Sequence, residues 1–236
     1  MSKKKTTTTT TTVITTVTEE NVKNNEKTQI VCILDRSGSM SSIMNDSIGG
    51  FNTFLGQQRE LPDKATLTLV LFDDKYELLY DNVDIKKVRD ITKTEWYPRG
   101  TTALYDAIGK TINDVKATHN KLGTEKPSKV LVCIVTDGHE NSSKEYGLEN
   151  IKKIISDCEK DKWNFMYLAA NQDAFSVGTS FGVSGANTFT YTATNDGVVN
   201  MSNTLNSATV SYRAMSTSDV DFDIKSKSLI NSDDEK

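Results

Sequence analysis

The chain has 236 residues, 36% of them hydrophobic, and a formal net charge of −4 with a pI of about 5.3. This size suits a single domain with polar tails, and the acidic balance gives no electrostatic reason to expect nucleic acid or an anionic membrane as a partner. No apolar run approaches the roughly 20 residues of a membrane helix, and the N-terminal lysines lead into threonines rather than into a secretory signal. The three cysteines form no C-x-x-C pair, so we expect free buried thiols in a cytoplasmic protein.

Both ends of the chain are polar and of low complexity. Residues 6–12 are an unbroken threonine run, and the C-terminal end is rich in serine and aspartate. Neither composition offers an apolar face that could offset the entropy of ordering the chain. We therefore predict a flexible N-terminal arm over residues 1–26, one domain over 27–215, and a flexible tail over 216–236.

Between the tails, short apolar runs alternate with helical periodicities. In chain order, we expect a strand at 30–34, a helix at 41–61, strands at 65–72 and 76–80, a helix at 102–117, a strand at 130–135, a helix at 148–158, a strand at 165–169, a short helix at 174–181, a strand at 188–192 and a last helix capped by Asp196 and running to Met215. Gly49 and Gly50 count against the first helix, and Gly182 fits the end of the short one. The alternation predicts a doubly wound, mostly parallel, Rossmann-like α/β sheet with one antiparallel edge strand and helices on both faces.

Polar residues follow two of the predicted buried strands. The first strand leads into Asp35-Arg36-Ser37-Gly38-Ser39, the strand at 130–135 leads into Thr136-Asp137-Gly138, and a loop with Thr101 and Thr102 enters a helix. Carboxyl ends of parallel strands share one rim, where ligands bind at the reversal of strand order. Two carboxylates and three hydroxyls there are an oxygen-only set, which suits Mg²⁺ first, with Mn²⁺ or Ca²⁺ as alternatives. Capping of turns and helices would explain each hydroxyl singly, but not two repelling carboxylates without a counter-ion.

In this order, the D-x-S-x-S segment, the Gly-Thr loop and the strand-ending Asp-Gly resemble the metal-ion-dependent adhesion site (MIDAS) of von Willebrand factor A (vWA) domains. The resemblance covers about residues 28–215 and implies the vWA fold. It implies that Ser37 and Ser39 are direct ligands, and that Thr102 is direct in one state of the site and water-mediated in another. It implies that Asp35 and Asp137 act through water or as the charge that holds the ion. An open coordination position would accept a carboxylate from a protein partner.

One departure from the family concerns the loop before the second long helix. The family loop often reads Gly-Gly-Thr-x-Leu, whereas here Gly100 is followed by Thr101. The segment Thr102-Ala103-Leu104 keeps the spacing to the leucine, so Thr102 is the predicted ligand and Thr101 remains the alternative.

The sequence gives little support for an enzyme. A phosphoryl-transfer aspartate usually has a second acid two residues on, where this chain has Ser37, and neither a Gly-rich phosphate loop nor a G-x-S-x-G elbow is present. His139 and Glu140 are expected as solvated loop residues, and Trp96 and Tyr97 as packing residues. We therefore expect a non-enzymatic, metal-dependent adaptor module. The alternatives are a structural or virion-attached component and, less favoured, a metal-dependent hydrolase; the sequence indicates no oligomeric state.

Overall fold

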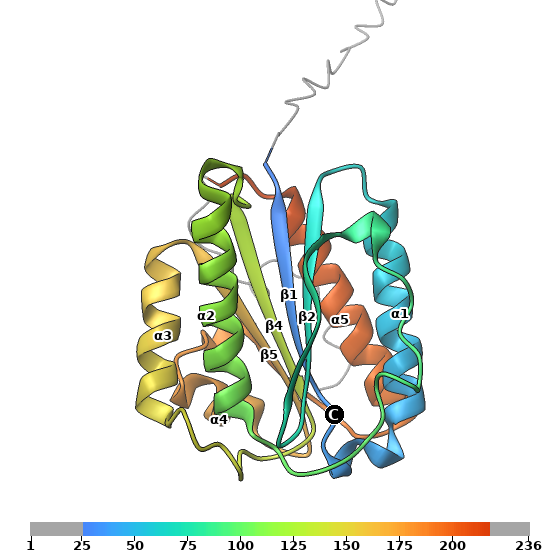
Figure 1. Ribbon diagram of the computed structural model, residues 1–236. Helices are drawn as coiled ribbons and strands as arrows, with labels where there is room; N and C mark the ends of the chain where they lie inside the picture. Colours follow the sequence, from blue (N-terminus) through green and yellow to red (C-terminus); the bar gives the residue numbers. More distant parts are fainter. Residues whose placement is uncertain (1–25, 218–236) are drawn as a thin grey trace, which may run out of the picture.

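The computed structural model describes residues 26–217 and contains a six-stranded sheet with the order β3-β2-β1-β4-β5-β6 (Figure 1). The predicted flexible segments 1–26 and 216–236 lie outside the described residues, except for Glu26, Ser216 and Thr217. The amide of Thr217 donates to the carboxylate of Glu26 at 3.1 Å. The strands are β1 (Thr28–Asp35), β2 (Ala65–Phe72), β3 (Tyr76–Asp84), β4 (Lys129–Thr136), β5 (Trp163–Ala170) and β6 (Thr188–Tyr191). The helices are α1 (Met44–Glu60), α2 (Leu104–Leu122), α3 (Leu148–Lys160), α4 (Ala174–Ser180) and α5 (Asn195–Ala214).

The sheet is parallel except at one edge. β1 pairs in parallel with both β2 and β4, and β5 and β6 continue the parallel order, whereas β3 runs antiparallel to β2. The chain first builds outward from β1 to β3 and then returns to add β4 on the other side of β1. The reversal of strand order therefore lies between β1 and β4, which confirms the predicted doubly wound architecture with one antiparallel edge strand.

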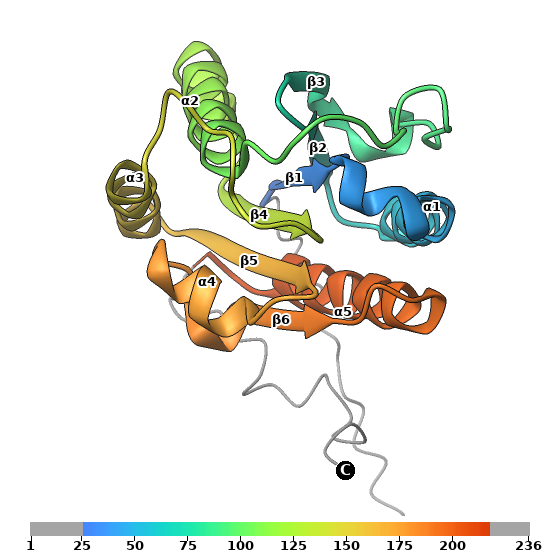
Figure 2. The same ribbon diagram turned by 90° about the horizontal axis from the view of Figure 1, so that it is seen from below.

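Helices cover both faces of this sheet, as Figure 2 shows along the strands. On one face, α1 and α5 pack against a core that includes Ile30, Cys32 and Leu34 of β1. On the other face, α2, α3 and α4 pack against a core that includes Val31 and Ile33 of the same strand. Because both faces are covered, residues 30–34 of β1 are a continuous apolar run rather than an alternating one, as expected of a parallel strand in a doubly wound sheet.

The differences from the sequence prediction lie at element ends. The first helix begins at Met44, because residues 38–42 form a separate 3-10 turn that carries the D-x-S-x-S segment away from β1. The N-cap of α5 is Thr194, whose side chain accepts a hydrogen bond from the Gly197 amide, so the prediction that Asp196 caps this helix was wrong. Gly182 has φ of +107° directly after α4, which fits its predicted place at the helix end. No helix among residues 26–217 is long and apolar enough to span a membrane.

The two adjacent glycines do not interrupt α1. Gly49 has open space where a Cβ would lie, whereas a Cβ on Gly50 would overlap the side chain of Ser202 on α5. The buried side chains of Phe51, Phe54 and Leu55 hold the helix against the sheet despite the low helix propensity of glycine. Gly50 therefore permits the close approach of α1 and α5, and Gly49 has no such role.

This contrast gives a prediction for two neighbouring substitutions. Gly49→Ala should raise the free energy of unfolding by about 0.5–1 kcal/mol, because alanine loses less backbone entropy in a helix. Gly50→Ala should lower it by about 1–3 kcal/mol, because the added methyl group forces α1 and α5 apart. Urea denaturation of both variants checks this, and a change of the same sign in both would contradict the described packing.

Candidate metal centre

The two acidic residues of the predicted site lie side by side at the carboxyl end of the sheet. Asp35 is the last residue of β1, and Asp137 directly follows the last residue of β4. These strands are parallel neighbours at the reversal of strand order, where open α/β sheets form their ligand sites. The loop with Thr102 precedes α2 at the same end, the lower end in Figure 1.

Hydrogen bonds hold Asp35 in a fixed, fully buried position. Its Oδ1 accepts from the backbone amide of Ser37 at 2.6 Å, and its Oδ2 accepts from Thr136 Oγ1 at 2.6 Å. Its backbone carbonyl accepts from the indole Nε1 of Trp96 at 2.9 Å. The carboxylate is therefore bonded to both adjoining segments before any ligand is added.

The two serines of the D-x-S-x-S segment form a hydroxyl chain to the second acid. Ser37 Oγ lies 3.0 Å from Ser39 Oγ, and Ser39 Oγ donates to Asp137 Oδ1 at 2.5 Å. The alternating serines thus point to the same side, as the spacing predicts. The other carboxylate oxygen, Asp137 Oδ2, is buried and has no hydrogen-bond partner.

Gly138 leaves a small space open between these oxygens. A Cβ built on it would lie 2.8 Å from Thr102 Oγ1, 3.3 Å from Ser39 Oγ and 3.6 Å from Asp35 Oδ2. Thr102 is buried, whereas Thr101 is exposed. The structure thus brings together all five predicted site residues and turns Thr102, rather than Thr101, toward the cluster.

This arrangement fits a divalent cation by the chemistry of its donors. Three hydroxyls and two carboxylates are hard oxygen ligands, and the buried Asp137 Oδ2 lacks a partner that such an ion would supply. Among residues 26–217, no group of three or more histidine, cysteine, aspartate or glutamate side chains could hold a metal ion. The fit to a cation at this rim therefore depends on the three hydroxyls together with the two carboxylates.

The electrostatics of the two acids point the same way. Burial, its main cause, raises the pKa of Asp35 to about 6, and the charge of Asp137 adds to the rise. Burial also raises the pKa of Asp137. Within the described part of the chain neither carboxylate forms an ion pair, and the nearby Arg36 and Arg99 are both paired with Asp73. Among residues 26–217, no basic side chain thus pairs with either of the two carboxylates.

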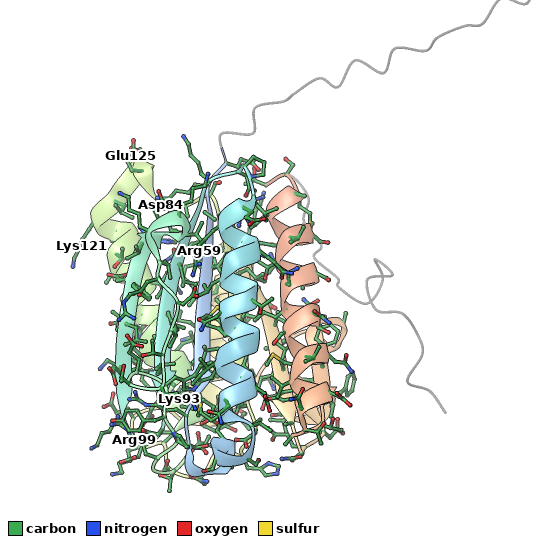
Figure 3. All side chains as sticks on the ribbon, turned by 90° about the vertical axis from the view of Figure 1, so that its right-hand side faces the viewer. Arg59, Asp84, Lys93, Arg99, Lys121 and Glu125 are labelled. Carbon is green, nitrogen blue, oxygen red and sulfur yellow. The ribbon has the colours of Figure 1, made fainter. Side chains whose placement is uncertain are left out.

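A buried ion cluster beside the site had not been predicted. Arg36 is fully buried and pairs with Asp73 at 3.2 Å and with Glu77 at 2.6 Å. Arg99 also pairs with Asp73, and its backbone amide donates to the Arg36 carbonyl at 2.8 Å. The cluster joins the strand ends of β1 and β2 to the loop before Thr102 (Arg99 is labelled in Figure 3). An arginine inside the D-x-S-x-S segment and the acids after β2 were its only sequence signals.

The expectation that Glu140 is a solvated loop residue was wrong. Its carboxylate is half-buried and accepts hydrogen bonds from the amides of Tyr105, Ser142 and Ser143, so it caps the start of α2. In return, Asp106 of α2 accepts from three amides of the loop at 144–146. The loop after Asp137 and the helix after Thr102 therefore hold each other in place. His139, by contrast, is exposed as expected.

The sequence matches no protein-family model and no curated protein. The fold resembles that of proximal thread matrix protein 1 from the mussel byssus with a zinc-occupied MIDAS motif, at a TM-score of 0.53 and 18% identity over 75% of this chain. It also resembles the PilB minor pilin from Streptococcus sanguinis, at a TM-score of 0.53 and 10% identity over 77% of this chain. This chain spans 44% of the mussel protein and 60% of the pilin. At such identities the likeness shows the fold: the chain has the α/β fold of a vWA domain.

The raised pKa of Asp35 predicts how stability depends on pH without metal. The folded state binds the Asp35 proton more tightly than the unfolded state does. The ionisation of Asp35 therefore leaves the free energy of unfolding unchanged at about pH 4 and lowers it as pH rises through about 6. In EDTA, we expect this group to lower the free energy of unfolding by about 2–3 kcal/mol near neutral pH relative to about pH 4. Asp35→Asn should lack this part of the pH dependence. Denaturation curves at several pH values check this, and identical pH profiles for both proteins would contradict it.

Gly138 provides a steric test of the metal site. Gly138→Ala places a methyl group 2.8 Å from Thr102 Oγ1 and displaces it, so we expect the affinity for Mg²⁺ to fall by at least about tenfold. The fold should lose less than about 1.5 kcal/mol. The control is Gly56→Ala, in open space on α1, which should leave metal affinity unchanged. Titration calorimetry measures the Mg²⁺ affinity of both variants. Binding of Mg²⁺ by Gly138→Ala with wild-type affinity would rule out a cation beside Gly138.

Proposed function

We propose that this chain is a non-enzymatic interaction module that binds a protein partner through a divalent cation. The observation that carries the proposal is the convergence of Asp35, Ser39 and Thr102 on the space at Gly138, next to the unpartnered Asp137 Oδ2. Two buried carboxylates without a basic partner need a positive charge. A relative in fold, the mussel thread protein, carries zinc at its MIDAS motif, which supports a divalent ion here.

The residues divide by role. Ser37, Ser39 and Thr102 would ligate the ion directly, while Asp35 and Asp137 would hold it by charge and through water. Mg²⁺ is the proposed ion, because it uses few carboxylates and keeps several waters. When bound, the ion supplies a Lewis-acidic position for an acidic group of the partner. The chain's own residues orient that position: Trp96 and Thr136 fix Asp35, and Glu140 fixes the loop after Asp137.

The surface around this rim suits a protein partner. Tyr97 is 41% exposed and lies in the loop whose Arg99 amide donates to the Arg36 carbonyl. Phe175 is 58% exposed and lies in the first turn of α4, the helix after β5. Exposed aromatic side chains are enriched in protein interfaces. Tyr97 is also held by Arg99, whose guanidinium lies over its ring at 5.2 Å and donates to its hydroxyl. We infer that these side chains flank the carboxylate of the partner, whereas the neighbouring Trp96 is a core residue.

A catalytic role has less support. The neutral hydroxyls of Ser37 and Ser39 bond to each other and to Asp137, and neither histidine takes part in that described bond network. His119 bonds to Gln29 instead. The carboxylate that accepts from Ser39 is Asp137, which in this proposal holds the ion, so we assign it no role as a base for a serine nucleophile. A panel of phosphatase and nuclease substrates tests the hydrolase alternative, and Mg²⁺-dependent turnover lost in Asp137→Asn would replace the present proposal.

The proposal predicts a stability difference between a site variant and a core variant. Asp137→Asn should be no less stable than wild type in EDTA, because it removes one of two uncompensated charges, but it should lose the stabilisation by Mg²⁺. For wild type that gain is about 2.7 kcal/mol when the ion is at a hundred times its dissociation constant. Ile33→Ala, at a fully buried core position, should cost about 2–5 kcal/mol with or without Mg²⁺.

Melting temperatures of both variants in EDTA and in Mg²⁺ check this prediction. Strong destabilisation of Asp137→Asn in EDTA would make Asp137 a structural hydrogen-bond acceptor and remove the basis of the metal site. Partner chemistry is tested by selecting from a random-peptide library in Mg²⁺. We expect enriched peptides to contain an Asp or Glu and to elute in EDTA. Peptides that bind equally well in EDTA would favour the structural-component alternative.

A further inference from the structure

A second candidate site lies at the opposite end of the sheet from the metal centre. A cavity of about 410 Å³ opens between the C-terminal part of α2, the loop before β4 and the start of β5. Its wall includes Lys116, His119, Lys126, Pro127, Val130 and Trp163. It is separated from the metal centre by the length of an eight-residue strand, about 25 Å. Its volume is within the range of small-ligand pockets.

The lining of this pocket carries two lysines and one aspartate. Lys116 and Lys126 come from different segments, and within residues 26–217 neither forms an ion pair with a carboxylate. Asp161 is the one acidic residue of the lining, and it is exposed. The amide of Asn120 adds a hydrogen-bond donor, whereas the Ser128 hydroxyl donates to the Lys27 carbonyl at 3.3 Å. The Lys116 ammonium lies 5.9 Å from the centroid of the Trp163 ring, on the same wall. A lysine acts as a point charge toward phosphate, so these two lysines offer positive charge to an anion.

One part of the wall is apolar. Pro127, Val130 and Trp163 are buried residues with little exposed surface. His119 is nearly buried, meets the Trp163 ring edge to face at a centroid distance of 5.5 Å, and is 2.5 Å from Gln29 Oε1 through its Nε2. Since the Gln29 amide nitrogen donates to Thr68 Oγ1, its Oε1 is the acceptor and the histidine Nε2–H is the donor. This wall offers a fixed surface to the organic part of a ligand.

We propose that this pocket binds a small phosphate ester, independently of the metal centre. The phosphate would lie between Lys116 and Lys126, and the organic part would lie against Pro127, Val130 and Trp163. Inorganic phosphate would fill only a fraction of the 410 Å³, so an ester with a ring of nucleoside size fits the cavity better than the free ion.

The test uses the two tryptophans as reporters at opposite ends of the sheet. The Trp96 indole bonds to Asp35 at the metal centre, and the Trp163 indole lines the phosphate pocket. In ¹⁵N-labelled full-length protein, we expect adenosine monophosphate to shift the Trp163 indole signal and leave that of Trp96 unchanged. Mg²⁺ should do the reverse. Adenosine, which lacks the phosphate, should shift neither signal.

Charge-neutral variants identify the anion contacts. The double variant Lys116→Gln with Lys126→Gln should bind adenosine monophosphate at least about tenfold more weakly, because each charged hydrogen bond to an anion is a strong one. The matched control is Lys121→Gln, which removes the same charge at the same end of α2 from a residue outside the lining (Figure 3). It should keep wild-type affinity. Lys126→Gln alone, at an exposed position, provides the test if the double variant does not fold.

Three results would overturn the proposal: no Trp163 shift at millimolar adenosine monophosphate, an equal shift with adenosine, or unchanged affinity in the lysine variants. Failure of the metal centre would appear separately, as a missing response of the Trp96 signal to Mg²⁺. The Trp96 signal therefore tests the metal centre and the Trp163 signal tests the phosphate pocket in the same sample.

Discussion

The buried carboxylate of Asp35 is the constraint on which the carboxyl edge of this sheet depends. A charge at the end of a central strand has no access to water, and its pKa of about 6 reflects that cost. The surrounding residues reduce the cost only in part: Ser37 and Thr136 donate to both oxygens, and no basic side chain in the described ranges joins them. The nearby Arg36 and Arg99 form ion pairs with Asp73 instead. Hydrogen bonds thus hold the Asp35 carboxylate in place while its negative charge has no basic partner among the described residues, and this is the condition that favours a bound cation.

Much of this organisation could be predicted from the sequence, because it depends on local patterns. Continuous apolar runs such as Ile30–Leu34 indicated buried parallel strands, and the strand ends then placed Asp35 and Asp137 on one rim. The choice between Thr101 and Thr102 could not be made from spacing alone, because it depends on which side chain the loop turns inward. In the structure, Thr102 is buried and its Oγ1 lies beside the space at Gly138, whereas Thr101 is exposed. The lack of a side chain at Gly138 carried no such meaning in the sequence.

The features that the sequence did not reveal are long-range ones. Glu140 accepts from the amide of Tyr105, 35 residues earlier in the chain, and the Arg36 pairs reach 37 and 41 residues along the chain. No periodicity encodes such partners. The cap of α5 shows the same limit at short range, since Thr194 and Asp196 are both good capping residues and only the backbone path decides between them. The rim residues that would contact a ligand were therefore easier to predict than the residues that hold them.

The parallel pairing of β1 with β4 also has a kinetic consequence. Asp35 and Thr136 are 101 residues apart in the chain, so their contact closes a long loop, and such contacts form slowly because loop-closure entropy must be offset first. The two halves of the proposed metal site meet only when this pairing forms, and in our proposal the cation then binds both. A ligand that recognises only the completed site stabilises the native state more than the folding transition state. A bound cation should therefore mainly lower the unfolding rate constant and change the folding rate constant little.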